Sequence, residues 1–167
     1  MGYTTTFDGQ LNIEPAISED LKNYINRFAD TRHMKRNRRY IEQENPNWFN
    51  DCYQGELGAE GEFYVGGTSN FGDDMDWSVI DYNVTAGTCP SLWCQWIIND
   101  NGGIAWDGYE KFHHYIDWLD YLIRNFLKPN GYIVNGEIKY EGESPDDFGI
   151  IVCKDNIVSK REGVETW

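Results

Sequence analysis

Two segments far apart in the chain show the two-residue alternation of a half-buried β-strand. In residues 3–13, YTTTFDGQLNI, apolar or small side chains alternate with polar ones, and residues 132–142, YIVNGEIKYEG, repeat the pattern. Because successive side chains of a strand point to opposite faces, each segment has one face for a core and one for water. Sheets with one solvated face are usually antiparallel. The two segments therefore predict an antiparallel sheet.

Helical spacing appears in two other segments. Residues 18–30 begin with Ser18 as a plausible N-cap and place apolar side chains at helical spacing. Residues 109–131, YEKFHHYIDWLDYLIRNFLKPNG, carry a longer apolar stripe that ends at Pro129 and Gly131. We expect these two main helices to pack on one face of the sheet.

Further strands are predicted at residues 62–67, 77–84, 91–98, 104–108 and 148–158. The segment 91–98, SLWCQWII, is apolar on both faces and is expected as a central strand that forms a hairpin with 104–108. A tight turn is expected at Asp155-Asn156, and we expect Gly9 and Gly136 to let a helix approach their strands closely. The fold class predicted is α+β: a single-domain antiparallel sheet with two main helices on one face.

The length of 167 residues fits a single domain spanning 1–167. Residues from about 45 to 76 are rich in Gly and Asn and read as an irregular insertion. A loop region of this length in a compact domain is uncommon unless it has a function or contains undetected elements.

The net charge of −14 restricts the classes of partner. Contacts with nucleic acid or an anionic membrane need Lys and Arg, so neither is expected and a basic protein partner is favoured. Residues 32–39 are the exception, because five basic side chains gather there. They could form an arm for nucleic acid, but we favour a helix extension whose charges face the acidic surface of the same molecule.

Localisation and cysteine chemistry follow from what the sequence lacks. No apolar run approaches the length of a membrane span, and MGYTTTFDGQL lacks the regions of a signal peptide, so a cytoplasmic protein is expected. The four cysteines are then expected as reduced thiols, since CPSLWC has neither zinc nor redox spacing.

Three polar groups are candidates for catalytic or metal sites. Asp146 and Asp147, with Glu143, could form an acid/base pair or a hard-cation site in GESPDD, but their Ser, Pro and Gly neighbours favour a solvated turn. The group Asp73, Asp74 and Asp76 lacks the spacing of a calcium loop. His113-His114 point about 100° apart on a helix and are poorly placed to chelate one ion. No catalytic residue, metal or cofactor is therefore predicted.

Two functions remain open from the residues. The first is a non-catalytic interaction protein that binds a basic partner through acidic surface residues, which are Asp8, Gln10, Glu137 and Glu141, with Asp73, Asp74 and Asp76 in the loop 51–76. The second is a small enzyme or ligand-binding domain with a cleft at WDGYEK.

In the second hypothesis Asp107 caps the long helix. Glu110 and Lys111 would then stand in its first turn, where backbone N–H groups and one ammonium could receive a ligand beside Trp106. The simpler interpretation is that Asp107 is only an N-cap and Trp106 only a core residue, and we favour it.

Several motifs, GYTTTFDG, LWCQW, WDGYEKF, GYIVNGEIKYEGE and DDFGIIVCKDNIV, cover most of the chain. In these motifs the chain resembles a family of small uncharacterised proteins of bacteria, phages and large DNA viruses. The resemblance brings no established activity and no catalytic residue. By analogy with small acidic viral proteins, it implies an inhibitor that occupies a basic surface.

Overall fold

The computed structural model describes residues 2–66 and 77–163. The chain divides into two compact units, which are residues 1–23 with 95–167, and residues 24–94. One boundary falls inside helix α1 (Glu19–Ala29).

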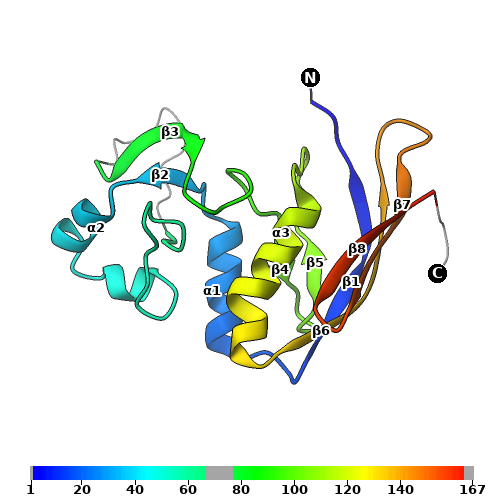
Figure 1. The fold of residues 1–167 in the computed structure, drawn as a ribbon, viewed down its shortest axis with the longest axis horizontal. Helices are drawn as coiled ribbons and strands as arrows, with labels where there is room; N and C mark the ends of the chain where they lie inside the picture. The colour runs from blue at the N-terminus through cyan, green and yellow to red at the C-terminus, as the bar shows by residue number, and fades with distance from the viewer. Residues whose placement is uncertain (1, 67–76, 164–167) are drawn as a thin grey trace. The chain divides into compact units, whose positions relative to one another are not determined.

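The first unit contains a six-stranded antiparallel sheet with the strand order β4-β5-β1-β6-β7-β8 (Figure 1). Its strands are β4 (Trp96–Ile98), β5 (Ile104–Trp106), β1 (Thr6–Glu14), β6 (Ile133–Glu141), β7 (Phe148–Lys154) and β8 (Ile157–Glu162). This sheet, with the main helices α1 and α3 (Tyr115–Leu122), confirms the predicted α+β class.

The long pair β1 and β6 forms the middle of the sheet. Nine residue pairs run without a shift from Thr6–Glu141 to Glu14–Ile133. One face is buried, as Leu11, Val134 and Ile138 show, while the alternate residues are mostly exposed. The alternation predicted from the sequence is therefore correct in both strands.

Two glycines in this pair act on the neighbouring strand instead of on a helix. Gly9 has a φ of +114°, and a Cβ placed there would lie 3.0 Å from the Glu137 carbonyl oxygen. Gly136 has a φ of +141°, and its Cβ would lie 3.2 Å from the Gln10 carbonyl oxygen. The expectation that they admit a helix was wrong, because the close approach is between the two strand backbones.

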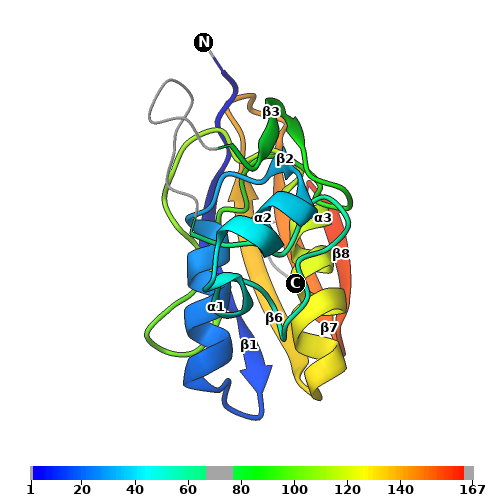
Figure 2. The ribbon, with the colours of Figure 1, turned by 90° about the vertical axis from the view of Figure 1, so that its left-hand side faces the viewer.

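Helix α3 covers the buried face of the sheet. Figure 2 shows it on the β7–β8 side, where its residues contact β8. It continues into a π-helical turn, η2 (Ile123–Leu127), and a 3-10 turn, η3 (Lys128–Asn130). Leu119, Leu122 and Phe126 of the predicted apolar stripe are buried, and so are Trp118 and Tyr121, which lie outside that stripe.

Helix α3 starts six residues later than expected. Gly108, Lys111 and His114 have φ values of 90°, 59° and 58°. These left-handed conformations cannot be part of a right-handed α-helix. Residues 109–114 therefore approach the helix as an irregular segment, although Phe112 is buried as its place in the stripe predicted.

At the two ends of the sheet, two predictions are confirmed and one was wrong. The hairpin of β4 and β5 is confirmed, but β4 has only three residues and lies at the edge of the sheet, so a central strand over 91–98 was wrong. The tight turn between β7 and β8 is confirmed, since Asp155 and Asn156 have φ values of 49° and 72°, as a primed hairpin turn requires.

The second unit is built from short elements. They are β2 (Met34–Arg36), α2 (Arg38–Glu44), the 3-10 turn η1 (Trp48–Asp51) and β3 (Val79–Thr85). A buried cluster of Ile41, Cys52 and Leu57 is covered by Trp48 and Tyr64. Strand β3 confirms the strand predicted at 77–84.

Two predictions in the second unit were wrong. The basic run does not extend α1, which ends at Ala29, because β2 and a new helix, α2, occupy the run. Residues 62–66 form turns and irregular structure instead of a strand.

All four cysteines are free and buried. Of the described helices, none is long and apolar enough to cross a membrane.

We predict that Gly136→Asn lowers the free energy of unfolding by about 1–3 kcal/mol, because a side chain at this φ is strained and meets the backbone of β1. Gly131→Asn is the matched control. Gly131 is left-handed, with φ 84° and ψ 12°, and has open space around its Cβ position, so it tolerates Asn. Chemical denaturation measures both, and equal losses would contradict the assigned backbone strain.

Candidate functional site

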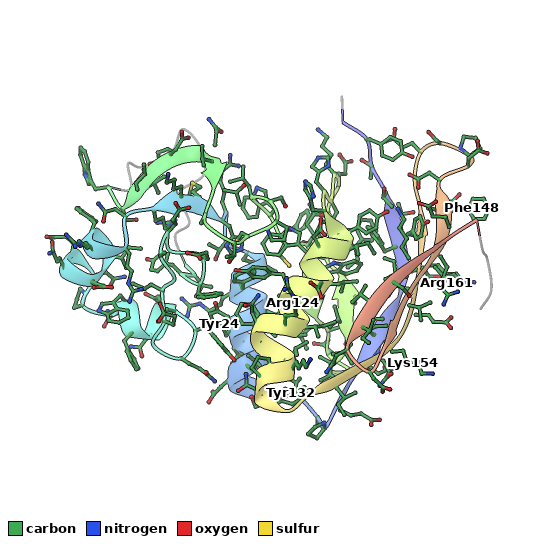
Figure 3. All side chains as sticks on the ribbon, in the orientation of Figure 1. Tyr24, Arg124, Tyr132, Phe148, Lys154 and Arg161 are labelled. Atoms are coloured by element: carbon green, nitrogen blue, oxygen red, sulfur yellow. The ribbon has the colours of Figure 1, made fainter. Side chains whose placement is uncertain are left out.

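The solvated face of the six-stranded sheet, called the outer face here, is the one opposite α3. The register places Asp8 across from Lys139, and Gln10 across from Glu137. Tyr115 of α3 contacts the ring of Tyr140, whose side chain points the other way. In Figure 3, Phe148 and Arg161 also lie on the side away from α3. The pairing thus gathers four predicted residues, Asp8, Gln10, Glu137 and Glu141, on one surface.

A hollow of about 450 Å³ lies at one end of this face. It is lined by Thr6, Phe7 and Asp8 from β1, Lys139, Tyr140 and Glu141 from β6, Phe148 and Gly149 from β7, and Pro145 from the connection between β6 and β7. Its volume is within the range of small-ligand pockets. Two of the predicted partner-binding residues, Asp8 and Glu141, therefore line a concave site.

The connection that carries Pro145 is fixed by the N-terminal segment. The Tyr3 hydroxyl donates to Asp147 Oδ2 at 2.6 Å and accepts from the Ser144 N–H at 3.0 Å. The Thr4 N–H donates to Glu143 Oε1 at 2.9 Å. The GESPDD segment is thus a polar turn, as expected, and two of its carboxylates serve to hold it in place.

The charged side chains that line the hollow differ from the carboxylates of the turn because no described residue binds them. In residues 2–66 and 77–163, no hydrogen bond or ion pair engages the side chains of Asp8, Lys139 or Glu141. Asp8 and Glu141 are exposed, and Lys139 is exposed between them. These groups can bind an external partner without first breaking an internal contact.

Gln10 has a structural role that the sequence did not reveal. Its Oε1 accepts from Asn99 Nδ2 at 2.7 Å, and its Nε2 donates to Asn12 Oδ1 at 3.1 Å. Asn99 Oδ1 in turn accepts from the N–H groups of Asn101 and Gly103 in the β4–β5 turn. Gln10 therefore joins this hairpin to β1, and its amide is engaged inside the protein instead of being available to a partner.

In the WDGYEK segment, hydrogen bonds join Trp106 and Asp107 to Tyr109. Asp107 Oδ1 accepts from the Tyr109 N–H at 2.9 Å, and Trp106 Nε1 donates to the Tyr109 carbonyl at 3.1 Å. Asp107 is not the cap of α3, which begins at Tyr115, and this prediction was wrong. Asp107 cannot cap α3 because the left-handed residues Gly108, Lys111 and His114 lie between it and the helix or at the helix start.

The other two residues of that segment also do not belong to the first turn of a helix. The Glu110 carbonyl accepts from Gln95 Nε2 at 3.0 Å, and Lys111 has a left-handed backbone. Neither contributes to a helix N-terminus where a ligand could bind. Trp106 packs edge-on against Phe7, with ring centroids 5.5 Å apart, which agrees with a packing role.

A lysine between two tyrosines is a feature that sequence reasoning missed. Lys160 Nζ lies 5.2 Å from the ring centroid of Tyr115 and 4.8 Å from that of Tyr140. Burial would lower the pKa of Lys160, but the hydrogen bond with Tyr115 and the electrostatic effect of both tyrosines outweigh it and raise the pKa. Lys160 therefore stays protonated near neutral pH, as a cation–π contact requires.

The basic run of residues 32–39 is largely bound within its own unit. Its contacts are Arg32 to the Tyr82 carbonyl, Lys35 to Glu60, Arg36 to Ser78 Oγ, and Arg38 to Glu42 and Glu56. Arg36 is 2% exposed and its guanidinium also covers the Tyr64 ring. The expectation that these charges face acidic groups of the same molecule is confirmed for Lys35 and Arg38, whereas Arg32 and Arg36 bond neutral oxygens.

The remaining predicted groups give no site. Asp73, Asp74 and Asp76 lie outside the described residues. His113 and His114 are exposed, and His114 Nδ1 lies 3.3 Å from Asp117 Oδ2. Within the part of the chain that the structure describes, no group of three His, Cys, Asp or Glu side chains could hold a metal ion.

No protein-family model, curated protein or solved structure matches this chain. The resemblance to uncharacterised proteins of bacteria, phages and viruses stays a prediction.

We predict that Gln10→Ala lowers the free energy of unfolding by about 1 kcal/mol, because the hairpin loses its hydrogen bond from Asn99. Glu137→Ala is the matched control, since Glu137 faces Gln10 on β6 and is exposed. It should change stability by less than about 0.5 kcal/mol. Urea denaturation measures both, and a larger loss for Glu137→Ala would contradict the assignment.

We also predict an acid-sensitive contribution from His33, whose ring is buried and whose Nε2 lies 2.9 Å from the Phe28 carbonyl oxygen. Burial lowers its pKa from 6.5 to about 3. The folded protein therefore binds this proton less well than the unfolded chain. Its contribution to stability is complete above pH 6.5 and decreases as the pH falls toward 3, by up to about 1.4 kcal/mol per pH unit.

His33→Gln tests this prediction, because an amide can keep the hydrogen bond but does not titrate. Its free energy of unfolding should fall less steeply than that of the wild type between pH 7 and about pH 5. The exposed His113→Gln controls for the loss of a histidine. Identical slopes for the wild type and His33→Gln would show that the buried ring makes no such contribution.

Proposed function

We propose that this protein is a non-catalytic interaction protein that binds a basic side chain of a protein partner in the hollow on its outer face. The observation that carries the proposal is the state of Asp8 and Glu141. Both carboxylates line the hollow, and no described residue engages them. The resemblance to phage and viral proteins adds an inhibitor-like role in the cytoplasm of a cell or host.

The lining suits the two parts of a Lys or Arg side chain. Phe148 and Pro145 offer apolar surface to the aliphatic stem, while the carboxylates offer acceptors to the charged head. An aromatic ring beside the carboxylates also favours a cation. The net charge of −14 would increase the rate of encounter with a basic partner at low salt.

The ionisation of the buried groups supports binding more than catalysis. Burial raises the pKa of the Cys153 thiol to about 11, and it also raises the pKa of the Cys52 thiol. The raised pKa of Lys160 keeps its amine protonated. A nucleophilic thiol or amine needs a lowered pKa, so these three groups are poor nucleophiles.

The second candidate is a small-ligand-binding domain that uses the same hollow. Its volume and the presence of Lys139 between Asp8 and Glu141 favour this candidate, because a small zwitterion could pair with both signs of charge. The ligand site proposed for this candidate is therefore the hollow instead of the WDGYEK segment.

The test is binding of a fluorescently labelled, arginine-rich peptide, measured by fluorescence anisotropy at low and high salt. The variant Asp8→Asn with Glu141→Gln should weaken binding about tenfold, the effect of losing two exposed ion pairs of roughly 0.7 kcal/mol each. Binding by the wild type should also decrease with salt.

The matched control is Asp100→Asn with Glu110→Gln, which removes the same charge from exposed positions outside the hollow. It should keep nearly all of the affinity. Equal weakening in both variants would show that net charge alone attracts the peptide and would overturn the hollow as the site. Binding of a small zwitterion but of no basic peptide would favour the second candidate.

A further inference from the structure

The outer face of β6 carries three charges in alternating sign. Glu137, Lys139 and Glu141 occupy alternate positions of the strand, and all three side chains are exposed. We call them the charged row. Over the described ranges 2–66 and 77–163, no hydrogen bond or ion pair engages any of the three. The row therefore presents a negative, positive and negative charge in a fixed order.

The strand fixes the spacing of these charges. Alternate residues of a strand lie about 6.6–6.8 Å apart, because each residue advances the chain by roughly 3.3–3.4 Å. The row is also held on both sides, since β6 pairs with β1 along all its length and with β7 from Gly136 to Glu141. An extended segment of another chain has the same spacing between its own alternate side chains.

We propose that the charged row binds an extended segment of the partner whose side chains follow the order basic, any, acidic, any, basic. The two basic side chains meet Glu137 and Glu141, and the acidic side chain meets Lys139. The inference rests on the proposed function and specifies its partner further. Because the order is the same in both directions, it applies to a segment running either way along β6.

The neighbouring residues refine the match. Phe148 lies opposite Glu141 in the register and lines the hollow, so the basic side chain at that end can place its stem against the ring. Asp8 lies opposite Lys139. It attracts the same basic side chain and partly offsets the attraction of Lys139 for the acidic one.

Lys139 makes the order matter. A segment with only basic side chains would place a like charge against the Lys139 ammonium, which is unfavourable for binding. If attraction to the carboxylates alone decided the affinity, the partner with the larger net positive charge would bind more tightly. With the charged row, the affinity also depends on where an acidic residue stands among the basic residues of the partner segment.

Two capped peptides of identical composition separate these cases. Lys-Thr-Glu-Thr-Lys matches the row, and Glu-Thr-Lys-Thr-Lys has the same net charge in another order. Isothermal titration calorimetry at low salt should show that the wild type binds the matched peptide about five- to tenfold more tightly, an effect typical of rearranging exposed ion pairs.

Reversing one charge in the protein should change the preference. Lys139→Glu should lose the discrimination between these two peptides and should bind Lys-Thr-Lys-Thr-Lys more tightly than either. Lys128→Glu, an exposed lysine in η3 outside the row, makes the same change in net charge and should keep the preference of the wild type.

The outcomes distinguish this inference from the proposed function. Equal affinity of the wild type for the matched and rearranged peptides would overturn the charge order, while the hollow could still bind basic side chains. If neither these peptides nor an arginine-rich peptide bound, both the inference and the proposed function would be overturned. A loss of preference in Lys128→Glu as well would overturn the role given to Lys139.

Discussion

The antiparallel pairing of β1 with β6 is the constraint on which the first unit depends. It joins the beginning of the chain to residues 133–141 through nine residue pairs without a bulge. Strands β5 and β7 are then added on its two sides, and the apolar alternation of both strands builds the buried face. A shift of β1 by one residue against β6 would expose Leu11 and bury Asp8 while Ile138 stayed in the core, so burial strongly disfavours such a shift.

The same register creates the candidate site. Because Leu11 and Ile138 both face the core, Asp8 and Lys139 both face solvent, and the register sets them opposite each other. Pro145, which also lines the hollow, belongs to the connection between β6 and β7, and the hydrogen bonds of Tyr3 and Thr4 hold that connection in position. Residues from both ends of the sequence are therefore needed before the hollow exists.

Sequence reasoning succeeded where one periodicity decided the outcome. The alternation in β1 and β6 predicted both strands and their solvated faces, and the surface residues Asp8, Glu137 and Glu141 were found in this way. It failed where backbone conformation interrupted a pattern, as at Lys111 and His114, whose left-handed φ values delay α3 although the apolar spacing continues. It also failed for Gln10, since its partner Asn99 can be identified only after β5 is placed beside β1.

The sequence could not predict which charged side chains have a partner inside the protein and which do not. Most of the basic run is held by acceptors within the second unit, and the carboxylates of Glu143 and Asp147 hold a turn. The charges along β6 have no such tasks. A side chain that already has an internal partner must lose it on binding, whereas one in water exchanges only solvent, so the unengaged row can bind at the smaller cost. For this reason the site is better identified by the charges that the fold leaves unused than by the total charge of the chain.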